Sequence, residues 1–182
     1  MNPMENELIM PGIRFGSVTS KNARNGPAPS VAACSSNLSP SAAVTSVSGS
    51  SSVMDMSICT YAVSAKERFI GVPPQTIEKY GVVSAETARA MADGVRKTAG
   101  SDIGISVTGV AGPTGGTADT PVGTVYVGLS TKGKTQARLV YTDPVLSGDE
   151  NAREYIRKST VLAALRWVAE EMQAEQKQHN RA

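Results

Sequence analysis

Strand-like and helix-like segments alternate from residue 57 onward, and this alternation constrains the fold more than any other feature of the sequence. The clearest helix begins at Ser84, a residue type that caps helices, and ends before Gly100, a residue type that terminates them. Its buried stripe is expected to contain Ala88, Met91, Ala92, Val95 and Ala99. The other expected segments are strands at 57–63 and 102–110, short helical turns at 64–72 and 73–81, a β-hairpin formed by 122–130 and 135–143, and a final helix from Ala152 that presents Ile156, Thr160, Ala163, Ala164, Trp167 and Val168 on one face. This pattern predicts a layered α/β domain with a mixed sheet.

The first part of the chain gives weaker signals. Residues 1–29 contain several prolines and glycines without periodicity, which predicts a poorly ordered N-terminal arm. Residues 25–54 carry no charged side chain and many serines, a composition typical of a low-complexity linker. Within this stretch, residues 30–34 are compatible with a short buried strand. Residues 39–47 are compatible with a helix of small residues, with Ser36 as a candidate N-cap, and a flexible linker fits them almost equally well.

Composition and charge exclude several classes of function. The 18 basic and 16 acidic residues are spread along the 182-residue chain, which disfavours nucleic acid as a partner because nucleic-acid binding needs a basic patch. No apolar run has the length of a membrane span and the N-terminus lacks a signal-peptide pattern, so we expect no membrane partner and a cytoplasmic location. The single histidine, His179, lies near the C-terminus, which disfavours a histidine triad or a zinc site. Neither a metal nor a cofactor is expected.

A glycine-rich loop follows the strand expected at 102–110, a position where backbone amides can converge on an anion. It lacks the Gly-Lys-Ser/Thr ending of a Walker A loop, and its spacing differs from that of a dinucleotide-binding turn. On spacing alone, a wide turn in which glycine supplies positive φ fits as well as an anion-binding loop does. The candidate binding residues of this loop are Thr108, Gly109, Gly112, Pro113, Gly115 and Gly116.

Tyr61 and Lys66 form a second candidate group. A lysine can act as a base if burial or a neighbouring charge lowers its pKa, and a lysine paired with a nucleophile permits acyl transfer without histidine. On the residues alone, the favoured interpretation of Lys66 is an ordinary solvated side chain.

Cys34, Ser35 and Ser36 lie at a possible strand-to-helix turn. A nucleophile at such a turn would face the backbone amides of a helix N-terminus, which stabilise a developing oxyanion. A small buried core residue is the commoner role for a cysteine in an apolar stretch. The residues alone therefore leave both interpretations open.

Taken together, the segments GVVSAETARAMADGVR (81–96) and ISVTGVAGPTGGTADTPVGTVYVGL (105–129) closely resemble the CinA C-terminal domain family, the nicotinamide mononucleotide amidohydrolases. With its weaker flanks, the resemblance covers roughly Val31 to Ala169. It places the nucleophile turn of the family within the serine-rich stretch at 25–54, which we therefore expect to be folded. It implies a single three-layer α/β/α domain, which we place at 30–172, that forms a homo-oligomer. The polar residues at the end of the chain predict that the last helix ends in a polar C-terminal tail at 173–182. The resemblance also implies hydrolysis of the carboxamide of nicotinamide mononucleotide, a small-molecule nucleotide substrate, to nicotinic acid mononucleotide and ammonia.

The resemblance assigns roles to individual residues. The family motif Ala-Glu-Ser-Cys-Thr-Gly-Gly carries the nucleophilic serine, and without gaps that serine falls on Cys34. A shifted register would instead make Ser35 or Ser36 the nucleophile, and the ungapped match downstream favours Cys34. The tyrosine and lysine downstream fall on Tyr61 and Lys66, both unchanged. Amides at Ser35 and Ser36 would then hold the oxyanion, and the glycine-rich loop together with Arg153, which begins a shared Arg-Glu-x-x-Arg element, would contact the nucleotide.

The nucleophile motif is also where this sequence departs from the family. Ala33 replaces the glutamate, and Asn37 and Leu38 replace the two glycines. Leu38 brings a side chain to a position where glycine permits close backbone approach to a ligand. We therefore carry three hypotheses: a working amidohydrolase, a catalytically impaired relative that acts as a nucleotide-binding or interaction module, and a structural subunit of an oligomer without a ligand.

Overall fold

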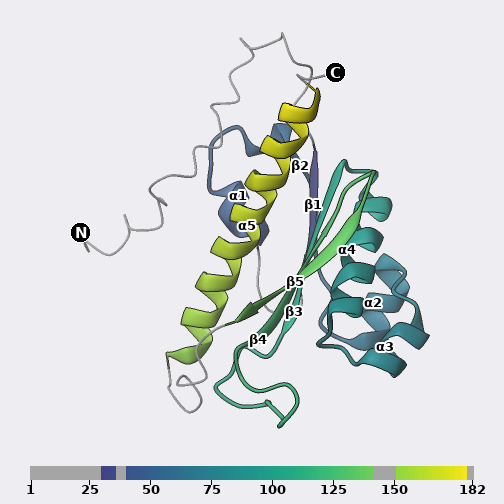
Figure 1. The fold of residues 1–182 in the computed structure, drawn as a ribbon, viewed down its shortest axis with the longest axis vertical. Helices are drawn as coiled ribbons and strands as arrows, with labels where there is room; N and C mark the ends of the chain where they lie inside the picture. Colours follow the sequence, from purple (N-terminus) through teal and green to yellow (C-terminus); the bar gives the residue numbers. More distant parts are fainter. Residues whose placement is uncertain (1–29, 36–39, 142–150, 180–182) are drawn as a thin grey trace.

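The computed structural model describes residues 30–35, 40–141 and 151–179, and these residues form a five-stranded mixed sheet flanked by helices (Figure 1). The order across the sheet is β2-β1-β3-β4-β5. Strand β1 pairs in parallel with β2 and β3, whereas β4 pairs antiparallel with β3 and β5. The strands are β1 (Val31–Ser35), β2 (Met54–Cys59), β3 (Ile103–Gly109), β4 (Thr124–Ser130) and β5 (Thr135–Tyr141). The predicted α/β fold with a mixed sheet is confirmed.

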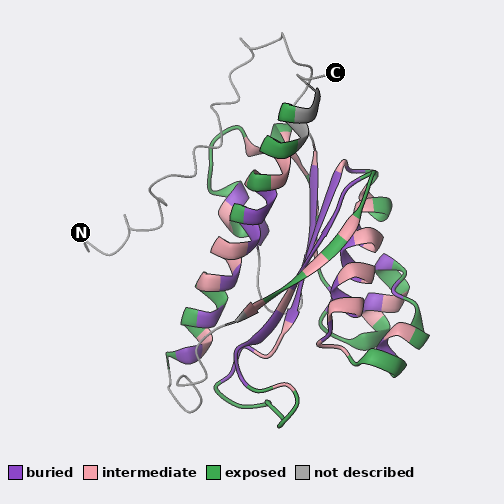
Figure 2. Cartoon of the chain, viewed as in Figure 1, coloured by how far each residue is buried: buried purple, intermediate pink, exposed green. Residues whose placement is uncertain are grey.

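Helices cover both faces of the sheet and make it the middle one of three layers (Figure 1). One apolar cluster joins β1 to the helices α2, α3 and α4 through Ala32, Ile70, Ile77 and Met91. A second cluster joins the opposite face to α5, and burial is concentrated along the strands between the two helix layers (Figure 2). The helices are α1 (Pro40–Thr45), α2 (Val63–Ile70), α3 (Pro74–Tyr80), α4 (Ala85–Ala99) and α5 (Ala152–His179), with a short 3-10 helix, η2 (Ser50–Ser52).

Helix α4 begins and ends where the sequence predicts. The Ser84 hydroxyl accepts a hydrogen bond from the Thr87 backbone N–H at 3.1 Å, and Gly100 adopts the left-handed conformation that terminates helices. The predicted stripe is fully buried except at its last member, Ala99, which is half-buried. The capping residue and the apolar spacing are therefore confirmed as the local causes of this helix.

Two glycines bring α4 into backbone contact with the sheet. A Cβ added at Gly104 would lie 2.2 Å from the Ala92 carbonyl oxygen, and one added at Gly128 would lie 2.2 Å from the Ala88 carbonyl oxygen. No side chain can occupy these distances, so strands β3 and β4 must carry glycine where the helix crosses them.

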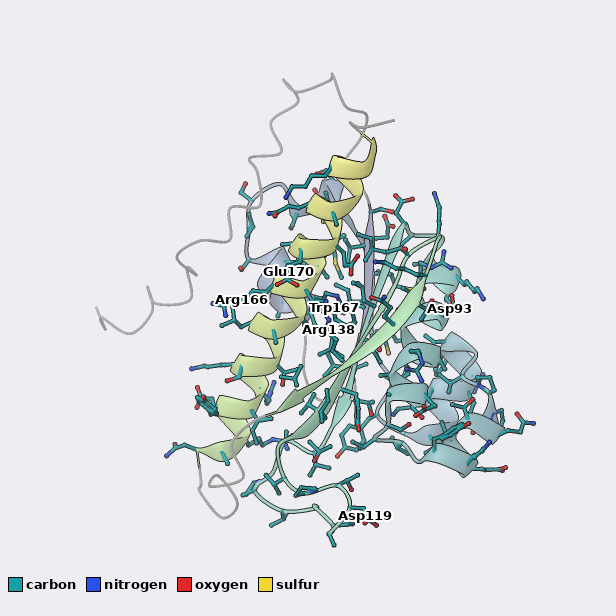
Figure 3. The ribbon with its side chains drawn as sticks, viewed as in Figure 1. Asp93, Asp119, Arg138, Arg166, Trp167 and Glu170 are labelled. Carbon is teal, nitrogen blue, oxygen red and sulfur yellow. The ribbon has the colours of Figure 1, made fainter. Side chains whose placement is uncertain are left out.

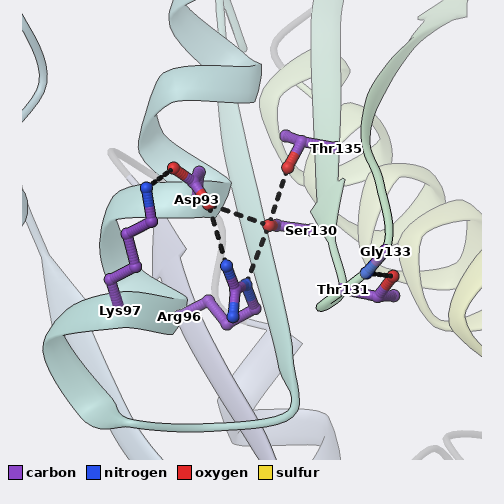
Figure 4. A network of polar contacts seen from close by, with 7 residues as sticks. All are labelled: Asp93, Arg96, Lys97, Ser130, Thr131, Gly133 and Thr135. Atoms are coloured by element: carbon purple, nitrogen blue, oxygen red, sulfur yellow. Dashed lines mark hydrogen bonds and ion pairs between the residues drawn. The ribbon is translucent and has the colours of Figure 1, made fainter.

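A polar network joins the C-terminal half of α4 to the hairpin formed by β4 and β5 (Figure 4). Asp93 accepts hydrogen bonds from Arg96 at 3.1 Å and from Lys97 at 2.6 Å, and these two cations lower the pKa of its carboxyl group. Arg96 Nε also donates to Ser130 Oγ at 3.0 Å. Because β4 runs antiparallel to β3, this network lies at the sheet edge opposite the carboxyl end of β3.

The structure corrects one predicted strand. The strand expected at 57–63 is β2 (Met54–Cys59), and Val63 already begins α2. The reason is local: helix α2 begins here, with the Lys66 backbone N–H donating to the Ala62 carbonyl, and Lys66 Nζ donates to the Thr60 carbonyl. Neither contact leaves a signal in the apolar pattern.

The serine-rich stretch is folded where the structure describes it, as β1, α1 and η2, so the linker interpretation is wrong for those residues. Helix α5 continues through the polar segment from 173 as far as His179, because its Ala, Glu, Gln and Lys residues favour helix, and a domain boundary at 172 stays a prediction. The expected arm at 1–29 and the Ser36 cap lie outside the described residues. Among the described helices, none is long and apolar enough to cross a bilayer.

Candidate active site

The carboxyl ends of the three parallel strands meet at one edge of the sheet. Cys34 of β1 lies opposite Ile58 of β2 and Ser106 of β3, so Thr60 and Thr108 follow at the same edge. In open α/β sheets, ligands bind outside the carboxyl ends of the strands. The fold thus brings the expected nucleophile, the Tyr-Lys segment and the start of the glycine-rich loop to the edge where chemistry is most often built.

Cys34, Thr60 and Lys66 form a buried group that we call the thiol–lysine cluster. Cys34 Sγ lies 3.0 Å from Thr60 Oγ1, and either atom can be the donor. Lys66 Nζ donates to the Thr60 carbonyl at 2.7 Å and to the Tyr61 carbonyl at 3.1 Å. All three side chains of the cluster have an exposed fraction of 0%. Lys66 is therefore a core residue, and the interpretation as a solvated lysine is wrong.

Burial shifts the pKa of both titratable members of the cluster toward their neutral forms. It raises the pKa of the Cys34 thiol, against the opposing effects of the Thr60 hydrogen bonds and the Lys66 charge. It lowers the pKa of the Lys66 ammonium, although Cys34 and Cys59 both act in the opposite direction. A lowered pKa is the direction of shift that a lysine needs in order to serve as a base.

The two hydrogen bonds of Lys66 are compatible with a neutral amine that could accept a proton. A neutral amine has two N–H donors and one lone pair, and the carbonyls of Thr60 and Tyr61 take up both donors. Neither hydrogen bond uses the lone pair of a neutral amine, because the nitrogen is the donor in both. The two carbonyl acceptors orient the amino group, and neither supplies a negative charge that would stabilise the ammonium form.

Tyr61 contacts Lys66 through its backbone carbonyl, whereas its side chain is 69% exposed. The expected participation of the Tyr61 hydroxyl in proton transfer is not tested by this geometry and stays a prediction. Ser35 continues β1 beside Val107, and the structure does not describe its side chain. Ser36, with the oxyanion amides expected near it, lies outside the described residues.

The glycine-rich loop leaves β3 at the same edge and is held closed at its base. The Val110 N–H donates to the Thr124 carbonyl at 2.9 Å, and the Gly123 N–H donates to the Val110 carbonyl at 2.8 Å. Beyond this base the loop is exposed from Pro113 to Asp119, and Figure 3 places Asp119 at its outer end. The loop is therefore a well-anchored projection beside the cluster.

Two of its glycines are required by close approach to the returning chain. Gly112 has φ +72° and a Cβ there would lie 2.5 Å from Val122 Cγ1, while a Cβ at Gly116 would lie 2.7 Å from the Val122 backbone nitrogen. Gly109 ends β3, and a Cβ there would lie 2.7 Å from the Thr124 carbonyl oxygen. Gly115 has φ +91°, and Pro113 follows Gly112 through a cis peptide bond. The wide-turn interpretation therefore accounts for Gly112 and Gly116 without a ligand, and anion binding stays a prediction.

Arg153 and Thr108 join the loop to its surroundings. Arg153 Nη1, from the first turn of α5, donates to the Gly112 carbonyl at 3.1 Å. The buried Thr108 hydroxyl donates to the Val82 carbonyl at 2.7 Å and so ties β3 to the segment before α4. Arg153 and the Thr108 hydroxyl are thus both engaged within the protein, and their contact with a nucleotide stays a prediction.

Sequence reasoning missed Thr60, the residue that connects Cys34 to Lys66. Its one signal was its position directly before Tyr61, at the end of an expected strand run. Among the described residues, no group of three or more His, Cys, Asp and Glu side chains could hold a metal ion.

Comparisons with known proteins identify the class of this α/β protein. The model of the CinA C-terminal domain matches residues 33–172. A competence-damage inducible protein of Thermoanaerobacter pseudethanolicus is 48% identical over 122 residues, which are 67% of this chain and 28% of that protein. A CinA-like protein of Kosmotoga olearia is 45% identical over 125 residues, 69% of this chain and 29% of that protein. The chain thus spans less than a third of the length of these curated relatives.

Solved structures give the same class. The competence/damage inducible protein CihA of Agrobacterium tumefaciens superposes with a TM-score of 0.71 at 30% identity, covering 78% of this chain and 84% of that one. The competence damage-inducible protein A (ComA) of Klebsiella pneumoniae gives 0.71 at 27% identity, covering 79% and 86%. The chain belongs to the CinA C-terminal domain family.

Proposed function

We propose that this chain is an amidohydrolase that converts nicotinamide mononucleotide to nicotinic acid mononucleotide and ammonia. The observation that carries the proposal is the thiol–lysine cluster at the carboxyl edge of the parallel strands, beside an anchored glycine-rich loop. Cys34 supplies a nucleophile, and Lys66 supplies a base whose pKa is lowered by burial. Family membership supports the substrate class without naming the substrate.

The proposed reaction passes through a thioester. The Lys66 amine takes the proton of Cys34 Sγ, the sulfur forms a bond to the carboxamide carbon, and the carbonyl π electrons move to oxygen. When the carbonyl re-forms, the C–N bond breaks and the nitrogen leaves as ammonia with the proton returned from Lys66. Water then attacks the thioester, the C–S bond breaks, and the thiol and the carboxylic acid are released.

The nucleotide part of the substrate has a place in this proposal. The exposed part of the loop, with Gly115 and Gly116, offers backbone amides beside the edge, and Arg153 brings a guanidinium to the loop from α5. Guanidinium groups and backbone amides are the usual partners of a phosphate. We assign the phosphate to this side and the nicotinamide ring to the side of Cys34.

A second function is favoured by one specific observation. Cys34 has an exposed fraction of 0%, and burial disfavours its thiolate, the form that attacks. A relative that binds the nucleotide without hydrolysing it would have the same loop and the same buried thiol. In that case the thiol is a core residue and the loop is the functional part.

An ammonia-release assay on nicotinamide mononucleotide separates the two functions. We expect the parent chain to release ammonia, Cys34→Ala to release none, and Lys66→Met to lose about 10²- to 10⁴-fold in kcat, the usual contribution of a general acid-base group. Lys79→Met, which removes an exposed lysine of α3, is the matched control and keeps the parent rate.

Absence of ammonia release by the parent contradicts the amidohydrolase. A variant with the family motif Glu-Ser-Cys-Thr-Gly-Gly restored at 33–38 then shows whether the remaining scaffold supports the reaction. Calorimetric binding of the mononucleotide to the inactive parent supports the second function, and no heat of binding contradicts it. A cytoplasmic location, self-association and independence from cofactors accompany the proposal as predictions.

A further inference from the structure

We propose that Thr60 is the positioning residue of this site: its hydroxyl stabilises the thiolate of Cys34, and its carbonyl orients the amine of Lys66. The inference rests on the proposed function for its catalytic meaning, and its central test does not require turnover. Thr60 is the first residue after β2, fully buried, and it contacts both reacting groups of the cluster.

The first step of the argument is that one residue serves two groups. The Thr60 side chain points to Cys34 with a separation of 3.0 Å between Oγ1 and Sγ. Its main chain points to Lys66 with a separation of 2.7 Å between the carbonyl oxygen and Nζ. Since Cys34 belongs to β1 and Lys66 to α2, Thr60 fixes the distance between a strand and a helix that have no chain connection at this point.

The second step concerns the direction of the hydrogen bond. While Cys34 is a thiol, either its S–H or the Thr60 O–H can donate. Once the proton has left, sulfur can only accept, so the Thr60 hydroxyl must be the donor. A hydrogen bond to a charged group is stronger than one to a neutral group, and the contact therefore favours the thiolate. It acts against the burial that raises the pKa of this thiol.

The third step excludes other sources of the same effect among the described neighbours. The titratable groups that act on Cys34 are Lys66 from α2, which favours the thiolate, and Cys59 from β2, which disfavours it. The residues of α3 and α4 in the same cluster, Ile77 and Met91, are apolar. Thr60 is thus the neutral group that supplies Cys34 with hydrogen bonds.

The experiment titrates Cys34 directly. Protein labelled with carbon-13 at cysteine Cβ gives a signal whose shift follows thiol ionisation, and Cys34→Ser assigns it. Thr60→Val removes the hydroxyl and keeps the shape of the side chain, whereas Thr60→Ser keeps the hydroxyl. We expect the Cys34 midpoint to rise by about one to two pH units in Thr60→Val, the size of a lost hydrogen bond to a charged group, and to stay near the parent value in Thr60→Ser.

Thr60→Ala provides a second variant without the hydroxyl, and folding is checked in each variant by the fluorescence of buried Trp167. An unchanged midpoint in the variants without the hydroxyl overturns the proposal. So does an equal rise in Thr60→Ser, because the cause would then be packing.

Kinetics give an independent readout. Under the proposal, Thr60→Val lowers kcat with little change in KM, and Thr60→Ser restores kcat, because the contact acts on the reacting groups and not on the bound nucleotide. An increase in KM at constant kcat contradicts it. If the parent releases no ammonia, the proposed function fails, while the titration of Cys34 still decides the role of Thr60.

Discussion

Lys66 is a buried lysine whose ammonium group donates to two main-chain carbonyls. Carbonyl oxygens satisfy the donors of an amine but carry no charge to offset the loss of hydration. Lys66 therefore destabilises the folded state whenever it is protonated. One sign of this burial is present in the sequence: Lys66 precedes the buried Ile70 by four positions, so both residues lie on one face of α2.

This residue predicts a pH dependence of stability. The pKa of Lys66 is lowered in the folded state from its ordinary value of 10.5, so the unfolded chain binds more protons in the window between the folded pKa and 10.5. Stability therefore rises with pH across that window, and the full cost of Lys66 is present below it. In urea unfolding, we expect the parent to gain more stability than Lys66→Met as the pH rises toward 10.5. Parallel pH curves for the two proteins contradict the assignment.

The site residues differ in how far a sequence could place them. The sequence offers Cys34, Tyr61 and Lys66 as candidates, and the family motif assigns them roles that stay predictions. Thr60 was not found, because its role depends on a side-chain contact to β1 and a main-chain contact to α2, and neither is encoded in spacing. Burial of Cys34 agrees with the short buried strand expected at 30–34, whereas burial of Lys66 was not expected from the residues alone.

At the level of elements, ends marked by a capping or terminating residue were predictable and ends without such a mark were not. Helix α4 has a capping serine and a terminating glycine, and both lie where the sequence indicates. Strand β2 ends early because Thr60 and Ala62 direct their carbonyls toward Lys66. The α/β arrangement, by contrast, followed from the alternation of periodicities alone.

The contact of α4 with β4 predicts a strong effect of a small substitution. In Gly128→Ala the new Cβ would meet the Ala88 carbonyl oxygen at 2.2 Å and Ser106 Oγ at 2.5 Å, so the backbone of helix or strand must move. We expect a loss of about 1–3 kcal/mol in the free energy of unfolding, as for other overpacked cores.

Gly133→Ala is the matched control for that substitution. Gly133 lies in the turn between β4 and β5, and its added Cβ would meet nothing within 4 Å. Its stability in urea unfolding should stay within about 0.5 kcal/mol of the parent, the usual range for surface changes. Similar losses at both glycines would show that the contact with α4 is not the cause.

Over the whole molecule, the two apolar clusters share one sheet. Ala33 of β1 faces the cluster with α5, while Ala32 and Cys34 of the same strand face the cluster with α2, α3 and α4. If one cluster comes apart, one face of the sheet is exposed to water, and the strands that carry the other cluster lose stability. Arg138 Cζ lies 4.2 Å from the centre of the Trp167 ring, and Arg138 Nη1 lies 3.2 Å from Glu170 Oε2 (Figure 3). These two contacts join the edge strand β5 to α5.

This sharing predicts a single cooperative unfolding transition. Trp167, the one tryptophan of the chain, reports the α5 side through its fluorescence, and Cys34 reports the other side through its reactivity with a thiol reagent in a Cys59→Ser background. Both probes should give the same urea midpoint, as two-state domains do. Separate midpoints would mean that one helix layer detaches before the sheet unfolds.

The glycines beneath α4 also determine which mutations this protein can tolerate. Any change of the codon for Gly104 or Gly128 to that of another amino acid adds at least a Cβ, and at both positions that atom meets main chain. In a random screen for loss of function, changes at these positions report on folding, whereas changes at Lys66 report on chemistry. Measuring the soluble yield of each inactive variant therefore separates variants that fail to fold from variants that fold and lack activity.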